Sequence, residues 1–258
     1  MDIFFLDFSL ATIILLVFVA FVAGIIDAIA GGGGLITVPV LLLSGMEPAQ
    51  ALATNKLQGC AGTLSASYHF IKRKVVNLKA LLPAIITTAV GSAVGTLLVS
   101  YLDRSLLFKI IPVILIAVAL FFLFIHRIQP YISSKVQLGQ LGFALLIGTS
   151  VGFYDGLIGP GTGSFFTTAY LCLTGATLIN ATANTKILNA TSNVASLFIF
   201  SFTGHVLWGI GLAMAVGQWL GAQLGARLVV SKGNVLIRPL VILMCLLISS
   251  KLIYENWL

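Results

Sequence analysis

A succession of long apolar segments, separated by short basic or glycine-rich stretches, constrains this chain more than any other feature. Eight of them are long enough to cross a bilayer, since a spanning helix needs about 20 mostly apolar residues. They cover about residues 9–30, 49–71, 77–101, 106–125, 137–158, 178–203, 206–230 and 235–254, and two short ones cover 33–45 and 163–173. Only 8% of the residues are charged, whereas a soluble domain carries roughly a quarter. We therefore predict an all-α integral membrane protein with a single membrane domain.

The two short segments follow glycine-rich breaks, "GGGG" at residues 31–34 and "GPGTG" at 159–163. As helices they would measure roughly 17–20 Å, too little to cross a hydrocarbon core of about 30 Å. Non-helical backbone persists in a membrane only inside protein or beside a water-filled cavity. The free N–H groups at the start of each short helix would suit an anion. Tight packing of small residues is the alternative explanation for the glycines.

An internal repeat contains both breaks. Gly24, Asp27, Gly31, Gly33, Lys56 and Pro112 match Gly152, Asp155, Gly159, Gly161, Lys186 and Pro239 in the same order. "AVGSAVG" at residues 89–95 likewise matches "AVGQWLG" at 215–221. The order and spacing persist over about 100 residues. We predict two homologous halves, residues 1–130 and 131–258.

Basic residues gather in three short stretches between apolar segments, at about 72–79, 126–135 and 227–234. They form no concentrated face for nucleic acid. The positive-inside rule would place all three in the cytoplasm, which requires five membrane-entering segments in each half. An odd number inverts the second half relative to the first, as in many transporters with interrupted helices. If the short segments re-enter instead, the halves are parallel; we favour inversion.

Two lysines and two aspartates lie within the apolar segments. A charge at membrane depth costs at least about 2.5–3.5 kcal/mol, so Lys56 and Lys186 are expected to face a cavity or a partner. The alternative is that each lysine lies near a helix end and extends to the surface. Asp27 and Asp155 either neutralise the lysines or exchange a proton. Helical spacing aligns Thr182, Lys186, Asn189 and Asn193 on one face, and Lys56, Gly59 and Thr63 on the matching face.

Chemistry other than transport finds little support in the sequence. There is no Ser–His–Asp or Cys–His arrangement and no nucleotide-binding "GxxxxGK[ST]". The histidines and cysteines, His69, His126, His205, Cys60, Cys172 and Cys245, show no spacing typical of metal ligands. We predict no enzyme activity, no cofactor and no metal site.

The residues named above resemble the TauE/SafE sulfite exporter family, also called the toluene-sulfonate uptake permease family. The resemblance rests on "GIIDAIAGGGGLITVPVLLLSG", "ALATNKLQG" and "AVGSAVG" in the first half, and on "GFYDGLIGPGTGSF" and "ANTKILN" in the second. It covers nearly the whole chain. It implies a multi-pass transporter of the bacterial inner membrane that carries sulfite, organosulfonates or related sulfur-containing or carboxylate anions.

The sequence thus predicts a secondary transporter that binds a small anion between its halves near mid-membrane. An anion channel and a non-transporting membrane assembly subunit are the alternatives. The expected substrate-binding residues are Gly33, Gly34, Asn55, Lys56, Gln58, Gly161, Thr162, Gly163, Thr185, Lys186 and Asn189. Asp27 and Asp155 are expected to balance charge or couple transport to protons. The expected partners are the anion and the lipid bilayer, and a homodimer is left open.

Overall fold

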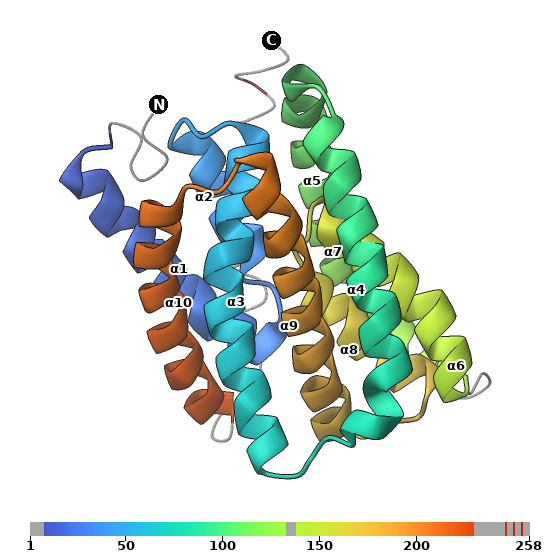
Figure 1. Ribbon diagram of the computed structural model, residues 1–258. Coiled ribbons are helices and arrows are strands. Elements are labelled where there is room, and N and C mark those ends of the chain that lie inside the picture. The colour runs from blue at the N-terminus through green and yellow to red at the C-terminus, as the bar shows by residue number, and fades with distance from the viewer. Residues whose placement is uncertain (1–7, 133–137, 230–245, 247–249, 251–253, 255–258) are drawn as a thin grey trace.

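The computed structural model describes residues 8–132 and 138–229, together with positions 246, 250 and 254. Its helices (Figure 1) are α1 Leu10–Ala30, α2 Gly34–Leu43, α3 Pro48–Lys72, α4 Leu78–Tyr101, α5 Arg104–Ile132, α6 Gln140–Phe143, the π-helical turn η1 Ala144–Gly148, α7 Thr149–Leu157, α8 Thr162–Leu173, α9 Leu178–Thr203 and α10 Trp208–Val229. The described residues contain no strand, which confirms the predicted all-α class. The predicted segment at 235–254 lies almost wholly outside the described residues.

Most helix boundaries agree with the predicted segments because local signals set them. The Ser9 hydroxyl accepts a hydrogen bond from the Thr12 amide at the start of α1, and Asn77 caps α4 in the same way. Pro48 occupies the first turn of α3, where a missing N–H costs nothing. The short helices α2 and α8 begin directly after the two glycine-rich breaks, as the sequence predicts.

The segment predicted as one helix over 137–158 is interrupted. It divides into α6, the π turn η1 and α7. A π turn widens the helix and disturbs the regular backbone ladder. The Ala144 carbonyl accepts a hydrogen bond from the Thr149 amide and a second one, at 2.7 Å, from the Thr87 hydroxyl of α4. This contact depends on a neighbouring helix, so periodicity along the chain could not indicate it.

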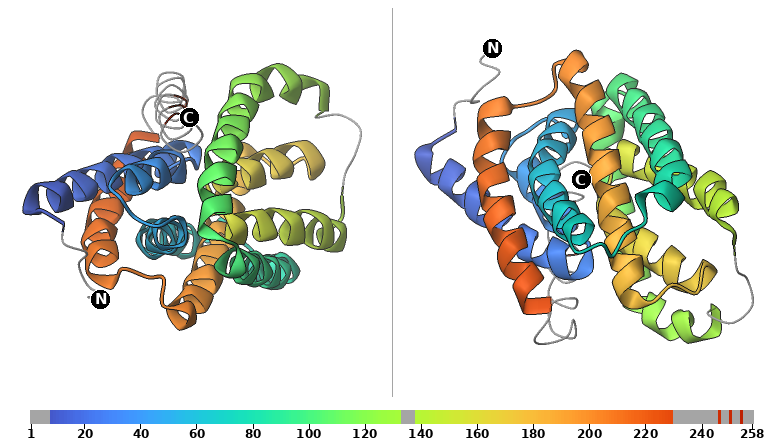
Figure 2. Two further views of the ribbon diagram at one scale, coloured as in Figure 1. Left: turned by 90° about the horizontal axis from the view of Figure 1, so that it is seen from above. Right: turned by 60° about the horizontal axis from the view of Figure 1, so that its bottom comes forward.

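Two helices, α3 and α9, form the centre of the bundle, with α1 and α10 packed on the side of α3 and α4 and α7 on the side of α9. Figure 2 shows the same grouping from above. The two central helices run in opposite directions in Figure 1, and the Ser67 hydroxyl near the end of α3 donates to the Lys186 carbonyl early in α9. The neighbouring helices follow the order α1–α10–α3–α9–α4–α7. The predicted repeat matches α1 with α7, α10 with α4 and α3 with α9, so each helix and its match lie at equal distances from the two ends of this row.

Small residues bring the outer helix pairs into backbone contact. A Cβ atom added at Gly221 of α10 would collide with the Phe21 carbonyl of α1. A Cβ added at the matching residue, Gly95 of α4, would collide with the Phe153 carbonyl of α7. Glycine permits the close helix approach that stabilises bundles in a membrane, where lipid tails are as apolar as leucine.

The distribution of side chains is that of a membrane protein. On α4, Leu82, Ile86 and Val90 are exposed, whereas Thr88 and Ser92 on the other face are buried. A water-soluble helix shows the opposite arrangement. Three described helical stretches are long and apolar enough to span a bilayer: Leu10–Ile29, Leu78–Tyr101 and Arg104–Phe121. The central helices α3 and α9 are more polar because their polar faces are turned toward each other and toward the site.

Candidate functional site

The two glycine-rich breaks meet inside the bundle. Gly31 ends α1 with a positive φ of 72°, and its N–H donates to the Asp27 carbonyl at 2.9 Å. A Cβ atom added there would lie 2.8 Å from the backbone of Gly163, and one added at Gly163 would lie 2.8 Å from the Cα of Gly31. Only glycine combines this φ with so close an approach. The breaks are therefore in direct backbone contact, and the ends of α1 and α8 are held together.

Lys56 and Asp155 form a buried ion pair across the two halves of the chain. The Lys56 Nζ lies 2.9 Å from Asp155 Oδ1, and Lys56 is only 1% exposed. Thr162 donates a second hydrogen bond to Asp155 Oδ1 at 2.7 Å, and the Ser192 hydroxyl donates to Oδ2. Asp155 is thus held by α3, α8 and α9 together.

Lys186 and Asp27 form the reciprocal pair. The Lys186 Nζ lies 3.1 Å from Asp27 Oδ2 and 2.5 Å from the Asp27 carbonyl oxygen. Lys186 is 3% exposed. Both lysines are therefore buried, and the alternative that they extend to the surface is wrong. Each lysine neutralises the aspartate of the opposite half, and breaking such a buried pair by removing one partner costs about 3–5 kcal/mol.

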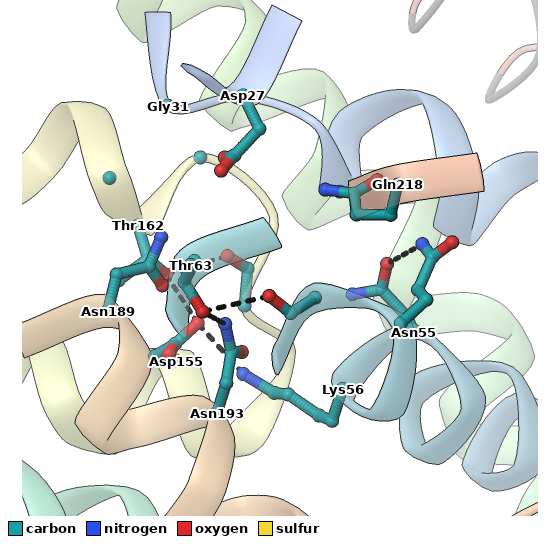
Figure 3. Close-up of a pocket in the computed structure, with 16 residues that line it drawn as sticks. Asp27, Gly31, Asn55, Lys56, Thr63, Asp155, Thr162, Asn189, Asn193 and Gln218 are labelled. Atoms are coloured by element: carbon teal, nitrogen blue, oxygen red, sulfur yellow. Dashed lines mark hydrogen bonds and ion pairs between the residues drawn. The ribbon is translucent and has the colours of Figure 1, made fainter. Parts of the chain in front are cut away.

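A polar cavity of about 30 Å³ lies where these elements converge (Figure 3). Of the residues predicted from sequence, Gly34, Asn55, Lys56, Gln58, Gly161, Thr162, Gly163, Asn189, Asp27 and Asp155 line it. Figure 3 shows the Asp27 carboxylate directed into the space between Gln218 and the Asp155 side of the wall. At about 10–15 Å³ for each water, this cavity has room for about two water molecules.

Three predicted site residues lie outside the cavity wall. Gly33 is turned toward α1, where an added Cβ would lie 2.8 Å from the Ala23 carbonyl. The Thr185 hydroxyl is 3.2 Å from the Thr167 hydroxyl of α8. The Lys186 ammonium group contacts Asp27, and Asp27 lines the cavity whereas Lys186 does not. These three residues therefore pack behind the residues that line the cavity.

Six further residues line the cavity and were not among the predicted site residues: Gly31, Gly59, Thr63, Gly159, Asn193 and Gln218. Helical spacing had already placed Gly59 and Thr63 on the face of Lys56, and Asn193 on the face of Lys186. Gln218 was missed entirely. Its only sequence signal is a polar side chain beside a glycine of "AVGQWLG", within an otherwise apolar segment.

Two amide oxygens at the cavity have no hydrogen-bond partner among the described residues. They are Oε1 of Gln58 and Oε1 of Gln218, and the two residues are 1% and 3% exposed. The Gln58 amide nitrogen donates to Asn55 Oδ1 at 2.9 Å, and the Thr37 hydroxyl donates to the same oxygen at 2.6 Å. Buried polar atoms in proteins are nearly always paired with protein or with ordered water, so both oxygens are available to accept a hydrogen bond from a molecule in the cavity.

Within the described residues, no group of three or more His, Cys, Asp or Glu side chains could hold a metal ion. Cys60 and Cys172 are buried and free, while Cys245 lies outside the described residues. His205 lies in the turn between α9 and α10, where its Nδ1 is 2.8 Å from the Thr203 hydroxyl. The residues that line the cavity carry an ammonium group, amides, hydroxyls and carboxylates.

The sequence of this chain matches a known family. A sequence model described as Sulfite exporter TauE/SafE matches residues 16–252, which includes both breaks and both ion pairs. The chain belongs to the sulfite exporter TauE/SafE family. The family resemblance inferred from the sequence is confirmed.

Several bacterial proteins are similar to this chain over almost its entire length. The probable membrane transporter protein YfcA of Escherichia coli (strain K12) is 48% identical over 241 residues, covering 93% of this chain and 89% of that protein. A probable membrane transporter protein of Haemophilus influenzae (strain ATCC 51907 / DSM 11121 / KW20 / Rd) is 44% identical, covering 97% and 98%. The probable membrane transporter protein YunE of Bacillus subtilis (strain 168) is 28% identical, covering 94% and 98%. No solved structure matches the chain.

These relatives carry names that describe membrane transporters rather than enzymes. The family match, the names of these relatives and the apolar helices together identify this TauE/SafE protein as a multi-pass membrane transporter of the bacterial inner membrane.

Proposed function

We propose that this protein is a secondary transporter of a small anion, such as sulfite, an organosulfonate or a related sulfur-containing or carboxylate anion. One observation carries the proposal: a polar cavity lies between the breaks and is lined by the Lys56 side chain and the start of both short helices. An ammonium group and helix N-termini both favour negative charge. Asn55, Gln58 and Asn189 would orient the anion by hydrogen bonds.

The two halves, residues 1–130 and 131–258, act as inverted repeats, with eight full spans and the short helices α2 and α8. Support comes from the antiparallel directions of the matched helices α3 and α9, and from the reciprocal ion pairs. The turn after α3, the start of α6 and the end of α10 also lie at one end of the bundle in Figure 1, which would be the cytoplasmic end by the positive-inside rule. Movement of one half against the other would expose the cavity to each side in turn.

Charge balance links this transport to protons. The ammonium groups of Lys56 and Lys186 cancel the carboxylates of Asp155 and Asp27, so the empty site carries no net charge from these four groups. A bound anion would add an uncompensated buried charge, which is costly. A proton on Asp27, whose carboxylate faces the cavity, would restore neutrality. We therefore include proton coupling in the proposal.

Purified protein reconstituted into liposomes tests the function. Uptake of ³⁵S-sulfite should saturate, accelerate when unlabelled sulfite is loaded on the opposite side, and disappear in Lys56→Gln. An ohmic current with no saturation would instead identify an anion channel. If no sulfite, sulfonate or carboxylate moves and the protein co-purifies with a stoichiometric partner, it is an assembly subunit.

A further inference from the structure

We propose that the cavity selects a small monoanion that carries at least one O–H or N–H donor, and that it discriminates against equally charged anions that have none. This inference rests on the proposed transport of an anion and specifies the chemistry of that anion. It assigns to Gln58 and Gln218 a role in specificity: each would accept a hydrogen bond from the solute.

The unpartnered oxygens of Gln58 and Gln218 carry the argument. Both are buried at the cavity wall, one from α3 and the other from α10. The Gln58 amide nitrogen is already engaged with Asn55, whose Oδ1 also accepts from Thr37, and this arrangement leaves the Gln58 oxygen without a donor. A buried acceptor that binding leaves unsatisfied retains its full desolvation cost. A solute with a donor removes that cost, and a solute of the same shape without one does not.

The charges of the site favour a monoanion over a dianion. Lys56 lines the cavity, but its ammonium group is 2.9 Å from Asp155 and is already neutralised there. Asp27 also lines the cavity and is neutralised by Lys186. A dianion would bring two negative charges to a buried site where the described lining residues include no unpaired positive side chain. A monoanion brings one, which a single proton on Asp27 can offset.

The volume of the cavity favours a compact solute. A space of about 30 Å³, or about two waters, admits a compact solute of a few heavy atoms and excludes long chains in this conformation. Donor and negative charge must therefore lie within one or two bonds of each other. The negative oxygens would face Lys56 and the start of α8, and the donor would face Gln218 on the opposite side of the cavity (Figure 3).

Sulfamate and methanesulfonate provide a matched pair of probes. Both are monoanions of nearly the same shape, but one presents an NH₂ group where the other has a methyl group. We expect calorimetry on the purified full chain to show sulfamate binding about tenfold or more tightly than methanesulfonate. Glycolate and propionate form a second pair, with a hydroxyl in place of a methyl, and glycolate should bind more tightly in the same way.

Variants of the two glutamines, with a matched control, test whether their side-chain oxygens cause the preference for sulfamate over methanesulfonate. Gln218→Met keeps the side-chain length and removes the acceptor, so the affinity for sulfamate should fall toward the affinity for methanesulfonate. Gln58→Met removes the other acceptor, and the ratio of the two affinities should fall in this variant as well. Thr88→Val is the matched control, because Thr88 Oγ1 is also buried with no partner among the described residues but lies outside the cavity. It should leave the preference unchanged.

Three outcomes would overturn these statements. Equal affinity for sulfamate and methanesulfonate, with clear binding of both, would overturn this inference and leave the anion site intact. Failure of sulfite and all four probes to bind would overturn the proposed function and this inference with it. A preference that survives both glutamine variants would remove Gln58 and Gln218 from the specificity determinants and overturn the inference as stated.

Discussion

Lys56 and Asp155 are separated by 99 positions in the chain, yet their Nζ and Oδ1 atoms are 2.9 Å apart in the centre of the bundle. The pair joins α3 of the first half to α7 of the second, and Lys186 with Asp27 joins α9 to α1 in the reciprocal sense. Each pair therefore forms only when helices that are far apart in the chain are packed together. The two predicted roles of the aspartates, neutralisation and proton exchange, are compatible in this geometry.

The first prediction separates the structural and binding roles of Lys56. Lys56→Met leaves Asp155 buried and unpaired, so it should destabilise the protein by about 3–5 kcal/mol and abolish anion binding. The double variant Lys56→Met with Asp155→Asn should recover most of the stability, because no uncompensated charge remains. It should not recover binding. Melting temperature in detergent and calorimetry with sulfite measure the two properties, and restored binding in the double variant would contradict the prediction.

The second prediction concerns proton coupling through Asp27. Asp27→Asn cannot take up a proton, so an imposed pH gradient should no longer drive accumulation of the anion in liposomes. Exchange of labelled for unlabelled anion should persist, since exchange needs no net proton movement. Asp103→Asn, at an exposed position between α4 and α5, is the control and should behave as the unmodified protein. Gradient-driven accumulation in Asp27→Asn would exclude Asp27 as the coupling group.

The third prediction tests the contact between the breaks. Gly163→Ala places a Cβ 2.8 Å from the Cα of Gly31, so the two breaks must separate. We expect a loss of about 1–3 kcal/mol in stability and a large loss of transport. Gly139→Ala introduces the same methyl group where nothing lies within 4 Å, and should change stability by no more than about 0.5 kcal/mol. Normal transport by Gly163→Ala would show that the contact can open freely.

The fourth prediction is a pH dependence of stability at the turn between α9 and α10. Burial lowers the pKa of His205 below its ordinary value, and the Glu47 carboxylate opposes part of that shift. The unfolded chain, with a His pKa of about 6.5, then binds the proton first as the pH falls. The His205 contribution to stability is therefore complete above about pH 6.5 and is lost as the pH falls toward the lowered folded-state pKa. His205→Gln should flatten the melting temperature against pH in that range; an unchanged slope would contradict this assignment.

The sequence by itself determined the helical class, the positions of most helices and the two breaks, because segment length, apolar composition and glycine act locally. It also indicated that Lys56, Lys186, Asp27 and Asp155 required partners, since the cost of a charge in lipid does not depend on the fold. The structure alone decided which lysine meets which aspartate, that Lys56 lines the cavity while Lys186 lies behind Asp27, and that Gln218 completes the wall. Those relationships depend on how helices distant in the chain pack against one another, and a pattern along one helix carries no information about the distance to the next.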